Sequence, residues 1–390
     1  MTHPLRQYST YKPGLFGDET PEALRGFCAR FGFEGLEAFM DDIKSRDKVL
    51  FADAEERRLL GDRLSSLSVK RLHCSYWAYP TSFLAKNDFA ELVERFGGEK
   101  NVSGYYGDLT GDHIFARWAQ EYELARDLGA QAYVFHLIDY APIDGRWNFS
   151  ISKHDIRQAM VFMTQQFLNI LADRGLLDAG SPVIELENAG WGLEHGVQTA
   201  EDYQLLFSQV HDPLCKLRIS WDCNHLLHAL GYDESASSAR FFLPPEEVGE
   251  GMRELEREYG GTPSVMAQKW LEYNILDSRI VGRTGCLQLS DCKPNAIEYF
   301  VNGKLSGTYF TELAALKSWD EQENYGVDIV LSAYDSHVAI GDGVLVPENV
   351  RILVAAVRKA APEAVVLHEL KNSPDQEAAI GRQTAALRLS

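Results

Sequence analysis

Eight short apolar runs alternate with helical stretches along the chain, and this alternation limits the possible folds more than any other feature. The runs are rich in β-branched or aromatic residues and cover residues 12–17, 35–40, 69–76, 132–138, 182–188, 217–222, 285–290 and 364–370. Between them, segments such as 112–128 and 156–174 repeat apolar residues at helical spacing. Strand and helix repeated eight times predict a closed (β/α)8 barrel, although an open doubly wound sheet also alternates strand and helix.

The placement of polar side chains separates these two architectures. Six successive runs end on, or carry, a side chain able to bind a metal: His73, His136, Glu187, Asp222, Gln288 and Glu369. An open sheet gathers its ligand at one switch point, whereas a barrel uses the C-terminal ends of many strands. We therefore predict an α/β fold, a (β/α)8 TIM barrel formed by residues 1–390 as a single domain. Long insertions after the sixth and seventh strands, at 229–280 and 294–332, are expected to act as lids.

Charge and composition exclude some classes of function. The chain has 57 acidic and 38 basic residues, and its formal net charge of −19 repels nucleic acid. No apolar run approaches the ~20 residues needed to span a bilayer, and the N-terminal residues have no signal-peptide core. The six cysteines form no CxxC pair, which suits buried thiols in a reducing compartment. We expect a cytoplasmic protein.

Each candidate metal ligand at a strand end also has an ordinary structural explanation. A lone histidine such as His73 or His136 is more often a hydrogen-bonded core residue than a ligand. Glu187 stands in a run that otherwise looks fully buried, and a buried carboxylate is costly unless it is paired or bound to a cation. Glu185 has the same parity, so a salt bridge is the alternative explanation for both glutamates.

Two further pairs combine a carboxylate with an imidazole. Asp222 and His225 lie three residues apart where a strand ends, and an Asp–His hydrogen bond is the alternative to neighbouring metal ions. Asp335 and His337 lie two residues apart, so both point the same way in an extended backbone. Several histidines and carboxylates converging on one rim form a ligand mix suited to Zn²⁺ or Mn²⁺.

Three segments carry a resemblance to a known family. LENAGWG (186–192), DCNHLLHALGYD (222–233) and DSHVAIGDG (335–343) resemble motifs of the endonuclease IV group within the xylose-isomerase-like TIM barrel superfamily. The resemblance implies three neighbouring zinc ions. They would be held in turn by His73, His136 and Glu187; by Glu187, Asp222 and Glu369; and by His225, Asp335 and His337.

One position departs from that family. The family has a ligating histidine in an HLND motif after the seventh strand, and here the residues are Gln288, Leu289, Ser290 and Asp291. Gln288 offers only a neutral carbonyl oxygen, a weaker zinc ligand than imidazole. The second site is therefore expected to be weaker, completed by water, or occupied by a harder ion such as Mn²⁺.

Three enzyme classes stay open. We expect a multinuclear, zinc-type hydrolase with two or three Zn²⁺ ions that acts on a small phosphorylated or sugar-like substrate, because clustered ions activate water and stabilise phosphoryl oxygens. The alternative is a sugar isomerase or epimerase with a single Mn²⁺ or similar ion, which needs only Glu187, Asp222, Gln288 and Glu369. An AP-site DNA endonuclease is disfavoured by the net charge.

The catalytic candidates are Glu187, Glu369 and His225. Trp77, Trp147, Trp191 and Lys293 are candidates for substrate binding, with ordinary packing under lids as the alternative for the aromatic residues. The expected partner is a small molecule, such as a sugar or sugar phosphate, with no membrane, and nucleic acid is disfavoured. A homo-oligomer stays open.

Overall fold

The computed structural model describes most of the chain. The described residues are 5–10, 20–40, 51, 53–75, 90, 93–94, 98–99, 112–136, 138–140, 153–190, 194–233, 237–241, 249–292, 300–301, 304–305, 336–371 and 375–388.

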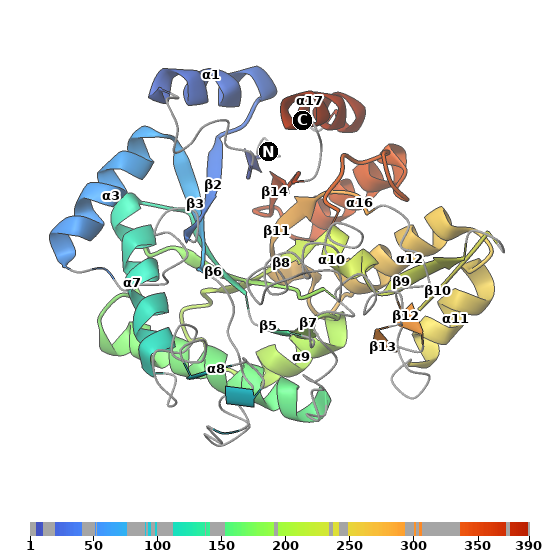
Figure 1. Ribbon diagram of the computed structural model, residues 1–390, viewed down its shortest axis with the longest axis horizontal. Coiled ribbons are helices and arrows are strands. Elements are labelled where there is room, and N and C mark those ends of the chain that lie inside the picture. The colour runs from blue at the N-terminus through green and yellow to red at the C-terminus, as the bar shows by residue number, and fades with distance from the viewer. Residues whose placement is uncertain are drawn as a thin grey trace.

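Eight parallel strands close into a barrel in the order β1-β14-β11-β8-β6-β4-β3-β2 (Figure 1). Each strand pairs in parallel with both neighbours. This confirms the predicted α/β barrel. The strands are β1 (Gln7–Ser9), β2 (Gly35–Phe39), β3 (Val69–His73), β4 (Ala132–His136), β6 (Val183–Glu187), β8 (Leu217–Asp222), β11 (Thr284–Leu289) and β14 (Val365–His368).

The prediction for the first strand was wrong. The apolar run at 12–17 was expected to start the barrel, but the first barrel strand is Gln7–Ser9, and residues 11–19 lie outside the described residues. β1 is only three residues long, and Tyr8 is its one apolar residue. Its place is set by pairing with β2 and β14, which a search for apolar runs does not detect.

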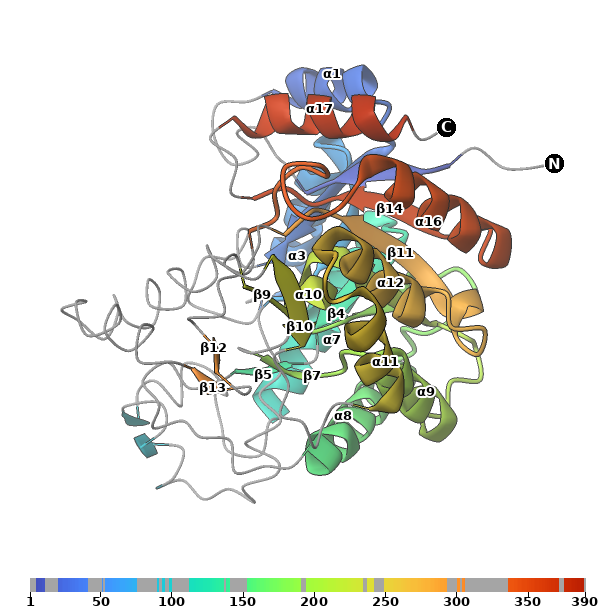
Figure 2. The ribbon, with the colours of Figure 1, turned by 90° about the vertical axis from the view of Figure 1, so that its right-hand side faces the viewer.

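Helices cover the outside of the barrel. The helices that follow one another around it are α1 (Pro21–Phe31), α3 (Ala54–Ser66), α7 (Asp112–Leu128), α8 (Lys153–Asp173), α9 (Ala200–Gln209), α12 (Pro263–Ile275), α16 (Pro347–Ala360) and α17 (Gln376–Leu387). α1 and α17 lie side by side in both views (Figures 1 and 2), joined by an ion pair between Arg30 and Glu377. No helix in the described part of the chain is long and apolar enough to cross a membrane.

Local sequence signals explain where these helices begin and end. In α1, Thr20 caps the N-terminus by accepting a hydrogen bond from Ala23 N, and Pro21 occupies the first turn. The helix ends at Gly32, whose φ of 74° is favourable for glycine. α9 begins with a reciprocal capping box between Thr199 and Asp202.

The long connection after β8 is only partly an insertion. It contains the hairpin β9 (Leu230–Asp233) and β10 (Ser238–Phe241), then α11 (Glu250–Tyr259) and α12. α12 buries Met266, Trp270 and Leu271 and packs against α9 and α16, so it is a barrel helix rather than part of a lid. The hairpin and α11 are the additional elements of 229–280. Of 294–332, the structure describes the short pair β12 (Phe300–Val301) and β13 (Lys304–Leu305). A lid role for either segment stays a prediction.

Strand alternation sends apolar residues to the helices and polar residues into the barrel. In β8, Trp221 packs edge-on against Tyr203 of α9, while Ser220 and Asp222 lie on the opposite face. The inside of the barrel has a small apolar cluster of Tyr8, Cys286, Val365 and Leu367. The polar residues nearest the C-terminal ends of the strands are therefore brought together inside the rim.

Candidate metal centre

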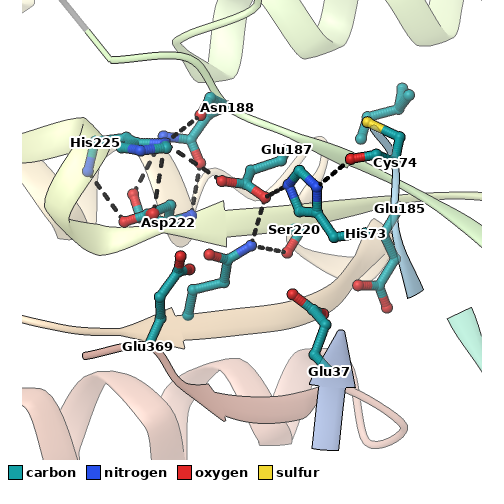
Figure 3. Close-up of polar contacts among 12 residues, drawn as sticks. Glu37, His73, Cys74, Glu185, Glu187, Asn188, Ser220, Asp222, His225 and Glu369 are labelled. Atoms are coloured by element: carbon teal, nitrogen blue, oxygen red, sulfur yellow. Dashed lines mark hydrogen bonds and ion pairs between the residues drawn. The ribbon is translucent and has the colours of Figure 1, made fainter. Parts of the chain in front are cut away.

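Five of the predicted ligands lie at the C-terminal ends of barrel strands and are buried. His73, Glu187 and Asp222 are the last residues of β3, β6 and β8, Gln288 lies in β11, and Glu369 directly follows β14. The register places Gln288 beside Asp222, since these residues pair between β11 and β8. Figure 3 shows Glu187, Asp222 and Glu369 directing their carboxylates into one shared space.

Three carboxylates form the first donor set. Glu187, Asp222 and Glu369 each offer an oxygen, and these oxygens lie within 4.8 Å of one another. All three residues are buried, where like charges at this spacing repel strongly unless a cation lies between them. Carboxylate oxygens are ligands that hard divalent ions such as Mn²⁺ and Mg²⁺ prefer.

Two buried oxygens that accept no hydrogen bond within the described residues show that this set fits a cation. Asp222 Oδ2 and Gln288 Oε1 are buried and accept no hydrogen bond within the described part of the chain. Buried polar atoms are normally paired, because an unmet acceptor carries its full desolvation cost. Coordination to a cation would satisfy both atoms.

Gln288 also has a fixed orientation. Its Nε2 donates to Glu187 Oε2 at 2.7 Å and to Ser220 Oγ at 3.0 Å. With both amide hydrogens used in this way, Oε1 is the atom left to act as a ligand. The side chain of Gln288 is therefore held in position by two neighbours.

Three histidines surround the carboxylates, and each is held through Nδ1. His73 Nδ1 lies 2.8 Å from Cys74 O, His225 Nδ1 lies 2.9 Å from Asn188 O, and His337 Nδ1 lies 2.9 Å from Ser290 Oγ. A carbonyl oxygen only accepts, so Nδ1 of His73 and of His225 carries the proton and the neutral ring keeps its lone pair on Nε2. Metal-binding histidines are commonly oriented in this way.

The Nε2 atoms of two of these rings point towards the carboxylates. His73 Nε2 lies 3.4 Å from Glu187 Oε2, and His337 Nε2 lies 3.9 Å from Asp222 Oδ2. Asp222, His225 and His337 form a second donor set whose ligand atoms lie within 4.8 Å of one another. The two sets share Asp222, so the structure offers two adjacent cation positions, one rich in oxygen and one with two imidazoles.

A buried aspartate organises the loop that carries His337. Asp291 accepts backbone N–H bonds from Cys292, Gly341, Gly343, Val344 and Leu345, at 2.8 to 3.1 Å.

The two glycines of this loop have separate structural reasons. Gly341 has a φ of 97°, and a Cβ on Gly343 would lie 2.6 Å from Asp291 Oδ1. His337 itself has a φ of 37°, an uncommon conformation for a residue other than glycine. Asp291 therefore fixes the backbone of the turn that follows His337.

Burial and the neighbouring charges shift the pKa values of the ligands. Burial raises the pKa of Asp222 to about 6, although His225 and His337 lower it. Burial also opposes ionisation of Glu369, but Lys371 and His337 outweigh it and lower the pKa of that carboxyl. Burial opposes protonation of His73, yet Cys74 and Glu187 raise its pKa well above the usual value. Cation binding at His73 would release that proton.

A second charged group lies one step deeper in the barrel. Arg71 donates to Glu37 Oε2 at 2.9 Å and to Glu185 Oε2 at 2.6 Å, and all three residues are buried. Because strand side chains alternate, Arg71 and Glu185 share faces with His73 and Glu187. The salt bridge with Arg71 explains the burial of Glu185, as the alternative interpretation predicted. Glu187 instead contacts two candidate ligands, His73 at 3.4 Å and Gln288 at 2.7 Å.

Some predicted residues lie outside the part of the chain that the structure describes. His136 ends β4 and its backbone pairs with Glu187, but the structure does not describe its side chain. Asp335, Trp77, Trp147, Trp191 and Lys293 lie outside the described residues. Their roles stay predictions.

Other residues of the site were missed by the sequence analysis. Lys371 Nζ lies 2.9 Å from Glu369 Oε1, and Ser220, Ser290 and Asn188 contact Gln288, His337 and His225. The spacing of Lys371, two residues after Glu369, was the available signal, since both residues share a face if the backbone stays extended.

Comparisons with known proteins show the fold. No family model matches the sequence, and no curated protein sequence matches it. The structure of the 3-keto-D-glucoside 4-epimerase YcjR from E. coli, in its apo form, is 12% identical with a TM-score of 0.50, covering 99% of this chain and 100% of that chain. Endonuclease IV from Thermus thermophilus is 15% identical (TM-score 0.46; 99% and 100% covered), and an L-ribulose 3-epimerase is 9% identical (TM-score 0.49; 99% and 95% covered). At such identity, the likeness to YcjR shows a shared barrel fold.

Proposed function

We propose that the protein is a metal-dependent enzyme that transfers a proton next to a carbonyl group of a small hydroxylated substrate, as a sugar isomerase or epimerase does. The observation that carries the proposal is the convergence of Glu187, Asp222, Gln288 and Glu369 from four neighbouring strands. Two of their buried oxygens accept no hydrogen bond from any described residue. These are the four positions that the single-ion alternative requires. From the sequence alone, a hydrolase was expected and a sugar isomerase or epimerase was the alternative. The structure leads us to propose the isomerase or epimerase first.

The residues of the site have separate roles in this reaction. A divalent cation at this set supplies polarisation of a substrate carbonyl. Glu187 and Glu369, buried on opposite sides of Asp222 in the strand order, are the groups that hold and move the proton. His225 Nε2 accepts a hydrogen bond from a substrate hydroxyl, since its Nδ1 is already bound to Asn188 O.

The donor chemistry supports one hard ion at this set. Three carboxylates and an amide oxygen favour Mn²⁺ or Mg²⁺, whereas zinc prefers imidazole and thiolate ligands. The comparison with YcjR supports the same direction, because a barrel of this fold carries an epimerase of a keto sugar.

A multinuclear hydrolase is the second candidate. The set of Asp222, His225 and His337 favours it, because two adjacent cations could activate a water molecule and stabilise a leaving group. The DNA endonuclease is not favoured, since a chain of net charge −19 repels a polyanion.

Solvent exchange tests the proposal directly. Protein loaded with Mn²⁺ is incubated in D₂O with a panel of ketoses and 3-keto-glycosides, and NMR follows deuterium at the carbon next to the carbonyl. We expect exchange with at least one sugar, and a loss of about 10²-fold or more in Glu369→Gln, since proton transfer by a positioned group contributes that much. Glu254→Gln on the exposed face of α11 is the control and should exchange normally. Absence of exchange with every sugar, together with hydrolysis of phosphate esters, would establish the hydrolase instead.

A further inference from the structure

Lys371 lies between residues of both donor sets. Its Nζ is 2.9 Å from Glu369 Oε1 and 3.3 Å from His337 Nε2. The backbone holds the two residues together as well, because Lys371 N donates to His337 O at 3.2 Å. The ammonium also lies 5.8 Å from the centre of the Phe39 ring. Four separate contacts therefore hold the lysine at the rim.

The lone pair of His337 can serve only one partner. Nδ1 of His337 is engaged with Ser290 Oγ, so Nε2 is the atom that the second donor set would use. A neutral imidazole nitrogen has one lone pair, and the ammonium of Lys371 now occupies it. A cation on the same nitrogen would lie about 2.0–2.1 Å away, and the ammonium would have to move.

The positive charge of Lys371 also disfavours a cation in the second donor set. The ammonium adds a positive charge beside Glu369 and His337, and a divalent ion in the second set would be repelled by it. The contact to Glu369 does not conflict with an ion in the first set, because a carboxylate has about four acceptor sites on its two oxygens.

We infer that Lys371 takes the place of a second cation, so that the first donor set binds one divalent ion and the second set stays closed to metal. The ammonium then supplies a fixed positive charge next to the bound ion. The inference about Lys371 rests on the proposed function only in one respect, namely that a divalent ion binds to the first donor set. It explains how a chain that keeps Asp222, His225 and His337 can be mononuclear.

Metal stoichiometry tests the inference without an activity assay. Full-length protein stripped with chelator is titrated with Zn²⁺ in a calorimeter, and the zinc retained after dialysis is measured by elemental analysis. We expect one equivalent in the natural protein and two in Lys371→Met, whose side chain is unbranched like that of lysine and carries no charge. Lys371→Arg should retain one equivalent because it keeps the positive charge.

A surface variant controls for the loss of one charge. Lys359→Met, on the exposed face of α16 at the N-terminal side of β14, should bind one equivalent. Two equivalents in the natural protein, or a single equivalent in Lys371→Met, would overturn the inference. Neither result bears on deuterium exchange into a ketose, so the proposed function would stand or fall separately.

Discussion

Gln288 is the residue that most affects the character of the proposed metal site. Its amide nitrogen is fixed by Glu187 and Ser220, and its buried oxygen accepts no hydrogen bond from the described part of the chain. The position was predicted because strand ends are visible in the sequence. Lys371 was not predicted, since its distance to His337 depends on the path of the chain after β14. The ends of strands could thus be predicted from the sequence, whereas the contacts of Lys371 depend on the path of a loop.

Replacing Gln288 should change metal affinity in opposite directions. Gln288→His introduces an imidazole, the better zinc ligand, and should tighten zinc binding by about tenfold or more. Gln288→Leu removes Oε1 and leaves Glu187 without its amide donor, so binding should weaken by a similar factor. Competition with a chromophoric chelator measures both. Equal affinities in the two variants would show that Gln288 is not a ligand.

Among the structural elements, the barrel strands position most of the candidate ligands, and a loop supplies His337. Eight parallel strands deliver Glu187, Asp222 and Gln288 through regular alternation, which the apolar runs predicted well. The first strand was predicted at 12–17 rather than at β1, because β1 has no apolar run. α12 lies within the predicted insertion 229–280, whose lid role stays a prediction. His337 depends on the loop at 336–345, where Asp291 replaces regular secondary structure as the source of order.

Asp291→Asn should destabilise this loop and weaken the second donor set. The amide keeps one acceptor oxygen and turns an NH₂ group towards backbone N–H donors, so we expect a loss of roughly 3 kcal/mol in unfolding free energy. Urea unfolding measures it. Asp342→Asn lies in the same loop and is exposed, so its effect should stay within about 0.5 kcal/mol. Similar losses in both variants would mean that the buried network around Asp291 contributes little.

At the scale of the whole molecule, the structure combines an acidic surface with a buried, polar rim. The net charge of −19 is compatible with small hydroxylated substrates and unfavourable for DNA. The closed barrel keeps the carboxylates out of water, where a cation would stabilise them. The alternation of strands and helices followed from periodicity in the sequence, and the closed barrel followed from polar side chains at the strand ends. The choice between one ion and several depends on atoms such as Lys371 Nζ.

Anomalous diffraction at the manganese edge, from crystals of the Mn²⁺-loaded protein, tests whether one hard divalent ion binds among Glu187, Asp222, Gln288 and Glu369. We expect a single strong peak within coordination distance, about 2.0–2.6 Å, of oxygens from these four residues. A strongest peak elsewhere, or no peak between these side chains, would contradict that expectation.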